Sequence, residues 1–254
     1  MNNILITGAA AGIGLATAEL FAEKGWSIGL IDVDESALKD MANRFSHQHI
    51  WYRALDVRDE TAAAQAVADF ASVHQNKLRV LFNCAGVLRI GEFEKMPLSD
   101  HKLIFDINVQ GVMNMSHAAF SFLKATPHAQ IINMSSASAL YGTPHFASYS
   151  ASKFAIRGLT EALNIEWKDH GISVVDIMPP FVNTGMVQSQ TFQAPVLKRL
   201  GVNLKAEEVA TTVWNSVGSN EVHHPVSLPF KTAMLINKLT PTRITKELMQ
   251  FLSR

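Results

Sequence analysis

A tyrosine and a lysine four residues apart, Tyr149 and Lys153, are the side chains of this sequence best suited to proton transfer. The segment around them is expected to be helical, and residues four apart share one helical face, so the phenol and the ammonium address the same space. A neighbouring ammonium stabilises a phenolate, so we expect it to lower the tyrosine pKa from its usual value near ~10. Such a tyrosine can take a proton from an alcohol or give one to a carbonyl.

Ser136 lies thirteen residues before Tyr149, directly after an apolar run that is typical of a strand. Its hydroxyl can hydrogen-bond a substrate oxygen and hold it near the phenol. An isolated Tyr-x-x-x-Lys pair is most often an accident of surface spacing. The pair indicates chemistry here because a nucleotide-binding pattern precedes it.

A glycine-rich loop follows the first apolar run and reads Thr7-Gly8-Ala9-Ala10-Ala11-Gly12-Ile13-Gly14. Glycine permits a tight turn and lets a pyrophosphate approach the backbone, while the next helix presents its positive end to the phosphates. The predicted cofactor residues of this loop are Gly8, Gly12, Ile13 and Gly14. The alternative is a tight strand-to-helix turn that binds nothing.

Asp32 closes the second apolar run, about 20 residues after the glycine loop, where an acidic side chain can accept from both adenosine ribose hydroxyls. It would also repel a 2′-phosphate, and neither Ala11 nor Val33 offers the positive charge that such a phosphate needs. We therefore predict NAD as the cofactor, held in part by Asp32 and Val33. The alternative is that Asp32 caps the next helix, a role equally open to Asp34.

Polar and small residues also follow the third and fourth apolar runs, and ligands of open α/β sheets bind at such carboxyl ends of strands. Asp56 and Val57 end the third run, and Asp56 could hydrogen-bond the adenine amino group. Asn83, Ala85 and Gly86 follow the fourth run, where small residues let the cofactor lie close to the backbone. All five are predicted cofactor residues.

These positions require a framework, and the pattern of the chain supplies one. Apolar runs lie at 3–7, 27–31, 50–55, 79–82, 130–134 and 173–177, and helical patterns lie between them. Strand–helix alternation implies a parallel sheet covered on both faces. We expect a single-domain α/β Rossmann fold over residues 1–254, with a doubly wound parallel sheet of about seven strands and helices on both faces. Residues from about 185 to 254 are expected to form the substrate loop and a C-terminal cap.

Composition excludes several classes of protein. Lys plus Arg and Asp plus Glu both number 22, so net charge gives no reason to expect nucleic acid or firm membrane association. The lone cysteine, Cys84, rules out an intramolecular disulfide, and the N-terminus lacks the features of a signal peptide. We expect a cytoplasmic protein. No metal is expected, because the pairs His47/His49 and His223/His224 have no carboxylate or cysteine at supporting spacing.

With these motifs in order, the chain resembles the compact single-domain branch of the short-chain dehydrogenase/reductase family from Asn3 to about Met186. Ser136, Tyr149 and Lys153 match the family's catalytic trio, and Asn108 in Asn108-Val109-Gln110-Gly111 matches its fourth catalytic residue. The resemblance implies that Asn108 bends its helix and holds a water linking Lys153 to solvent. It also implies that Lys153 binds the nicotinamide ribose, and that the protein is a homodimer or homotetramer.

After the sixth apolar run the family usually has Pro-Gly, then a threonine four residues beyond that glycine. Pro179 and Thr184 match, and the resemblance implies that Thr184 bonds the nicotinamide carboxamide, with Pro179 and Val182 as further cofactor residues. Pro180 replaces the glycine. Because proline fixes φ near about −65° and removes an N–H, this loop is expected to be stiffer than usual.

The substrate pocket is predicted from residues that flank the catalytic positions, and these are mostly apolar: Leu88, Leu140, His145, Phe146, Phe181, Met186 and Val187. His145 could instead bond a polar end of the substrate. The C-terminal apolar residues are expected to complete the core; a lid, or a surface for lipid or a partner subunit, is the alternative.

We therefore predict reversible hydride transfer between NAD(H) and a secondary alcohol/ketone pair (EC 1.1.1.-), with an apolar small-molecule substrate and Tyr149 as general acid/base. One alternative is an NADPH-linked 3-oxoacyl carrier-protein reductase, which Asp32 disfavours. A second is a non-catalytic dinucleotide-sensing protein, which the intact set of catalytic residues disfavours.

Overall fold

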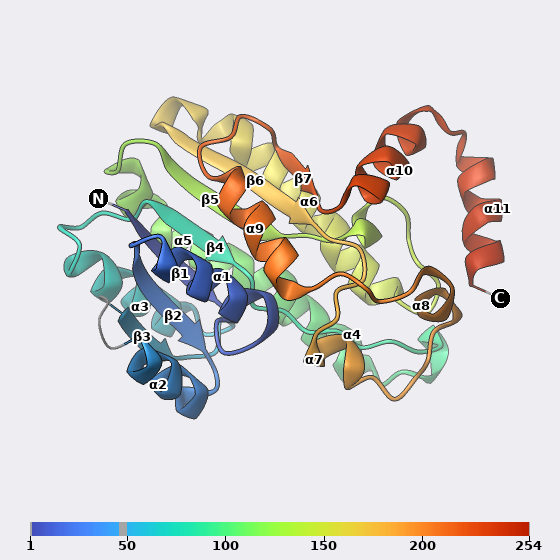
Figure 1. Ribbon diagram of the computed structural model, residues 1–254, viewed down its shortest axis with the longest axis horizontal. Helices are drawn as coiled ribbons and strands as arrows, with labels where there is room; N and C mark the ends of the chain where they lie inside the picture. The colour runs from blue at the N-terminus through green and yellow to red at the C-terminus, as the bar shows by residue number, and fades with distance from the viewer. Residues whose placement is uncertain (1, 46–49, 254) are drawn as a thin grey trace.

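The computed structural model describes residues 2–45 and 50–253, and a seven-stranded parallel sheet lies at its centre (Figure 1). Its strand order is β3-β2-β1-β4-β5-β6-β7, so the chain winds outward from β1 in both directions, as predicted. The strands are β1 (Asn3–Thr7), β2 (Ser27–Asp32), β3 (Ile50–Ala54), β4 (Val80–Asn83), β5 (Ala129–Met134), β6 (Ile172–Met178) and β7 (His223–Pro225).

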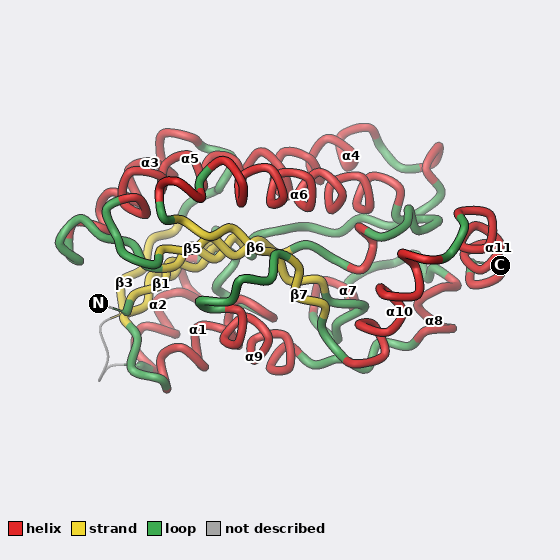
Figure 2. Tube along the Cα trace, turned by 90° about the horizontal axis from the view of Figure 1, so that it is seen from above, coloured by secondary structure: helices red, strands yellow, loops and turns green. Residues whose placement is uncertain are grey.

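Helices cover both faces of this sheet, as Figure 2 shows. One layer holds α3 (Glu60–Ser72), α5 (Val112–Lys124) and α6 (Ala147–Glu166), with α4 (Leu98–Phe105) beside α6. The other layer holds α1 (Gly12–Glu23), α2 (Glu35–Arg44) and α9 (Ala206–Ser216). The short helices α7 (Gly185–Gln188) and α8 (Pro195–Leu200) precede α9, and α10 (Leu228–Leu239) and α11 (Thr242–Leu252) end the chain.

The inner strands of the sheet are buried on both faces, which is why they are largely apolar. Ile4 and Ile6 of β1 pack into the core beneath α1 and α9, whereas Leu5 packs beneath α3 and α5. Edge-to-face contacts of Phe21 with Trp26 (5.1 Å between ring centroids) and Trp214 (5.0 Å) hold α1 against α9. The two cores therefore fix the carboxyl ends of the strands at one edge.

The caps of α2 and α3 show whether Asp32 caps a helix, which was the alternative to its predicted role in binding the adenosine ribose. Asp34 caps α2 by accepting from the Ala37 N–H (3.0 Å), and Asp59 caps α3 by accepting from the Ala62 N–H (2.9 Å). Asp32 caps neither helix.

The C-terminal helices differ from the expectation that they complete the core. No side chain described in α10 or α11 is buried, and both helices project from the body of the molecule (Figure 1). Among the described residues, no helix combines the length and apolarity that a membrane crossing requires, and no group of His, Cys, Asp and Glu is arranged to hold a metal ion. His47 and His49 lie outside the described residues.

Candidate active site

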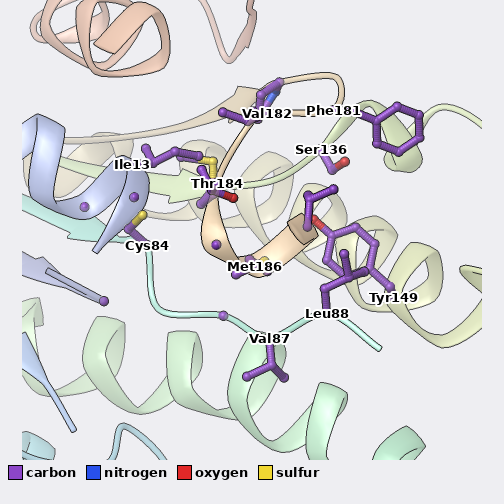
Figure 3. A pocket seen from close by; sticks show the side chains of 18 of the residues that line it. Ile13, Cys84, Val87, Leu88, Ser136, Tyr149, Phe181, Val182, Thr184 and Met186 are labelled. Atoms are coloured by element: carbon purple, nitrogen blue, oxygen red, sulfur yellow. The ribbon is translucent and has the colours of Figure 1, made fainter. Parts of the chain in front are cut away.

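A cavity of about 340 Å³ lies at the carboxyl ends of the strands, and it brings the glycine loop together with Ser136, Tyr149 and Lys153. Figure 3 shows Ile13, Cys84 and Thr184 on one side of it and Leu88, Tyr149 and Phe181 on the other. The predicted cofactor residues that line it are Gly8, Gly12, Ile13, Gly14, Asp32, Gly86, Tyr149, Lys153, Pro179, Val182 and Thr184.

The glycine loop is packed too closely for other residues. A Cβ on Gly14 would lie 2.0 Å from the Gly8 carbonyl oxygen, and one on Gly8 would lie 2.8 Å from the Ala85 backbone. Gly8 also has φ +67°, which favours glycine. Thr7 Oγ1 accepts from the N–H groups of Cys84 and Ala85 (both 3.0 Å), which fastens the end of β4 to the loop. Ala85 thus supports the loop from behind and does not line the cavity.

Asp32 is held by the backbone at the start of the cavity. Its Oδ2 accepts from the Ala10 N–H (3.0 Å), and its Oδ1 accepts from the N–H groups of Val33 (2.7 Å) and Asp34 (3.2 Å). These bonds orient the carboxylate beside the glycine loop. The Val33 side chain is exposed and lies outside the cavity wall.

Asp56 has a partner that sequence reasoning missed. Arg58 Nη2 lies 2.5 Å from Asp56 Oδ2, Arg58 Nε lies within 3.0 Å of both carboxylate oxygens, and the Arg58 N–H donates to Oδ1 (3.0 Å). Hydrogen bonding to Arg58 lowers the Asp56 pKa. The sequence did contain a signal for this ion pair, because Arg58 lies only two positions after Asp56. An adenine amino group would share this carboxylate with the guanidinium.

Val57 and Asn83 lie in the interior, outside the cavity wall. Asn83 Nδ2 donates to Ser116 Oγ (3.1 Å) and Asn133 Oδ1 (2.9 Å), and the Val57 carbonyl accepts from Asn114 Nδ2 (2.9 Å). Both residues thereby tie α5 to the strand ends. They stabilise the strand ends beneath the cavity, and their interior side chains do not favour direct contact with a cofactor.

Tyr149 and Lys153 lie on the first turns of α6, with Lys153 Nζ 5.5 Å from the centroid of the Tyr149 ring. Lys153 is buried, and its Nζ donates to the Met134 carbonyl (2.8 Å). Ser136 Oγ accepts from the Ser138 N–H (3.1 Å). The sheet end and the helix thus converge on one point, as the sequence predicted.

The titration of the pair differs from the sequence expectation. Burial raises the pKa of the Tyr149 phenol to about 12, although a hydrogen bond with Ser136 opposes the rise. Burial lowers the pKa of Lys153 to about 8, because a charged ammonium loses hydration there. The prediction that the lysine lowers the phenol pKa below its usual value is therefore wrong for the protein without a bound cofactor. Burial likewise raises the pKa of the Cys84 thiol to about 12, which disfavours a nucleophilic thiolate.

Asn108 lies in a π-helical segment, Asp106–Gly111, between α4 and α5. Its side chain is buried and accepts from the Val87 N–H (2.7 Å), while Nδ2 donates to the Val87 carbonyl (3.0 Å) and Ser152 Oγ (3.3 Å). The helix is therefore irregular where the resemblance implies a bend. The amide group holds the cavity-lining segment after β4 against α6.

Five of the seven predicted pocket residues line the cavity: Leu88, Phe146, Phe181, Met186 and Val187. Leu140 and His145 do not. The His145 ring packs on Phe192 (5.0 Å between centroids), and its buried Nδ1 has no hydrogen-bond partner in the described part of the chain.

Residues outside the predicted set form two groups around the cavity. Those that line the wall within two positions of a predicted residue are Ala11, Cys84, Val87, Met134, Ser135, Pro180 and Gly185. Ala194, Val196 and Leu252 pack in the apolar cluster behind Leu88 and Phe146. No local signal identifies this second group, because it comes from segments remote from every motif.

Comparison with known proteins gives a consistent result. The family model described as "short chain dehydrogenase" matches residues 2–194. The chain is 36% identical over 188 residues to "Oxidoreductase UcpA" of Salmonella typhimurium, covering 73% of this chain and 71% of that protein. It is 32% identical over 180 residues to "NAD-dependent glycerol dehydrogenase" of Listeria innocua, covering 71% and 70%. A short-chain dehydrogenase/reductase of Burkholderia phymatum, solved in complex with NAD, superposes with a TM-score of 0.82 at 26% identity, over 92% of each chain.

Proposed function

The chain belongs to the short-chain dehydrogenase family, and we propose that it catalyses reversible hydride transfer between NAD(H) and an apolar secondary alcohol or ketone. As a member of this family it is an oxidoreductase with a dinucleotide cofactor. The observation that carries the proposal is the single cavity in which Asp32 and the glycine loop are continuous with Ser136, Tyr149 and Lys153. A dinucleotide site and a proton-transfer site share one wall.

The residues present fit a dinucleotide. Gly8, Gly12 and Gly14 line the cavity without side chains of their own, and the start of α1 presents its N-terminal backbone there, which suits a pyrophosphate. Thr184 lies directly beside this loop, since a Cβ on Gly12 would lie 3.4 Å from its Cγ2. The Asp32 carboxylate, oriented by three N–H groups, supports NAD over NADP because a 2′-phosphate would be repelled.

Ser136 is oriented to donate. Its oxygen already accepts from the Ser138 N–H (3.1 Å), so its own hydrogen is available for the substrate oxygen or for Tyr149. This hydroxyl would hold the reacting oxygen within reach of the phenol. We assign Ser136 the positioning of substrate and Tyr149 the exchange of the proton.

The phenol and ammonium divide the proton chemistry. With a raised pKa, Tyr149 is protonated at neutral pH and suited to give a proton to a ketone. A nicotinamide cofactor supplies the hydride donor or acceptor and, when oxidised, a positive charge that favours the phenolate. Lys153, with a lowered pKa and one hydrogen committed to Met134, is suited to pass a proton onward. Both amide hydrogens of Asn108 are already donated, so a relay water near it would have to donate to the Asn108 side-chain oxygen or bind a main-chain group of Asp106–Gly111.

The substrate end of the cavity supports an apolar compound. Leu88, Phe146 and Phe181 form its wall together with Val187, and these side chains offer no hydrogen-bonding group to a polyol. The name of the Listeria relative makes glycerol the natural compound for comparison.

A screen of NAD⁺ reduction over alcohols of graded polarity tests this proposal. We expect little turnover with glycerol, more with isopropanol and most with cyclohexanol or larger apolar secondary alcohols. Turnover that is best with glycerol would contradict the apolar substrate. Turnover that requires NADP⁺ would contradict the cofactor assignment and favour the 3-oxoacyl reductase alternative.

A further inference from the structure

Helices α10 and α11 form a hairpin, the C-terminal arm (residues 228–252), which projects from the body of the molecule (Figure 1). Large apolar side chains on both of its helices face solvent: Leu235 is 63% exposed, Leu239 88% and Phe251 67%. On a core helix such large apolar side chains would be buried. Exposed apolar residues gathered on two consecutive helices mark an interaction surface.

The exposed apolar residues of each helix share one face. In α10, Leu228, Leu235 and Leu239 are seven and four residues apart, close to two turns and one turn. In α11, Ile244, Leu248 and Phe251 are four and three residues apart and form a second stripe. The arm thus carries two outward apolar stripes.

Charge distinguishes the arm from the rest of the chain. The arm holds four of the 22 basic residues of the chain but only one of its 22 acidic residues. The basic side chains Lys231, Arg243 and Lys246 are exposed. The protein is neutral as a whole, so the arm is basic and the remainder is acidic. Amphipathic helices with exposed leucines and basic residues bind the interface of anionic membranes.

We propose that the C-terminal arm docks the protein on the surface of an anionic lipid membrane. A 12-residue helix is about 18 Å long, against ~30 Å for the hydrocarbon core, so the helices would lie in the interface. Lysine is depleted from protein–protein interfaces, whereas at a lipid surface its stem lies along the acyl boundary and its ammonium reaches the headgroups. The lysines of the arm therefore favour lipid over a second copy of the chain.

The arm is attached beside the substrate end of the cavity. The Arg199 guanidinium of α8 lies over the Phe251 ring (4.7 Å to the centroid) and donates to the Phe251 carbonyl. Leu252 packs against the apolar cluster that contains Leu88 and Phe146. A docked arm would therefore bring this wall of the cavity close to the membrane.

Flotation of the full-length protein with vesicles tests the proposal without any measurement of turnover, so its outcome is independent of the proposed reaction. The vesicles are phosphatidylcholine alone or phosphatidylcholine mixed with phosphatidylglycerol. The binding variant is the double substitution Leu239→Glu and Leu248→Glu. The control is Leu98→Glu, which places one glutamate on an 82% exposed leucine at the start of α4, outside the arm. Circular dichroism and NADH binding verify that each variant is folded.

We expect the wild-type protein and the control to float with the anionic vesicles, and the double variant to bind at least about tenfold more weakly. Lys246→Gln should weaken binding to anionic vesicles about fivefold and leave phosphatidylcholine binding unchanged. Absence of wild-type flotation, or equal flotation of the double variant, would overturn the proposal. A second copy of the chain would be the occupant if the wild-type protein did not float and sedimented as a dimer, while the double variant sedimented as a monomer. That result would overturn the proposal.

Discussion

Replacing Asp32 by asparagine changes the adenosine end of the site with little change in shape. The carboxylate has three N–H donors: Ala10 on one oxygen, and Val33 and Asp34 on the other. An asparagine retains one oxygen, so at least one of these donors loses its acceptor. The substitution also removes the negative charge that we expect to bind the ribose hydroxyls and to repel a 2′-phosphate.

The expected effect follows from the loss of charge-assisted hydrogen bonds. A hydrogen bond to a charged group contributes about 1.5–3 kcal/mol, and ~1.4 kcal/mol is a factor of ten, so the NADH dissociation constant should rise about 10- to 100-fold. The NADPH dissociation constant should fall, because repulsion is removed. Fluorescence titration of each variant with both reduced cofactors measures the two constants.

A neighbouring carboxylate provides a matched control for this substitution. Asp34→Asn makes the same change of charge two residues away, but Asp34 caps α2 through the Ala37 N–H and does not line the cavity. It should change the melting temperature little, because asparagine caps a helix about as well as aspartate, and it should leave the ratio of NADH to NADPH affinity within about threefold. The reasoning would be refuted if Asp32→Asn bound NADH as tightly as the wild type, or if both variants changed the ratio equally.

Three further substitutions test separate parts of the account. Gly14→Ala places a Cβ 2.0 Å from a backbone oxygen of the glycine loop, so NADH affinity should fall by at least about tenfold. The control Gly142→Ala has open space around its Cβ and should leave NADH affinity unchanged. Equal NADH affinities of the two variants would contradict the loop geometry. Asn108→Ala removes the three hydrogen bonds of a buried side chain and should destabilise the fold by about 2 kcal/mol or more in denaturant unfolding. An unchanged midpoint would contradict this. The hydrogen bond with Asp176 raises the His223 pKa above 6.5, so its stabilisation is full below that pH and is lost as the pH rises through the raised pKa. The melting-temperature difference between the wild type and His223→Gln should therefore shrink with rising pH, and a difference that grows would contradict the assignment.

The fold was predictable because both faces of a parallel sheet are buried. Every residue of β1 is buried, so its central residues Ile4, Leu5 and Ile6 form an unbroken apolar run that is recognisable without knowledge of its neighbours. The glycine loop and Asp32 were predictable for a related reason. Each depends on a short segment whose backbone geometry requires particular residue types, such as the glycine at position 14.

Residues whose environment depends on assembly of the sheet were placed less well. Asn83 follows a strand, yet its amide points into the interior because Ser116 and Asn133 meet it there. The Tyr149 pKa was misjudged because the spacing from Lys153 carries no information on burial. The packing of Leu252 behind the cavity wall and the projection of the C-terminal arm depend on tertiary packing far from any motif.

Alcohol-dependent reduction of NAD⁺ by the Tyr149→Phe variant tests the central claim most directly. The substitution removes only the phenol oxygen from the shared wall of the cavity, so cofactor binding should persist. The account predicts that turnover falls about 10²- to 10⁴-fold while the NADH dissociation constant changes by less than about threefold. Turnover close to that of the wild type would contradict the assignment of Tyr149 as the acid/base.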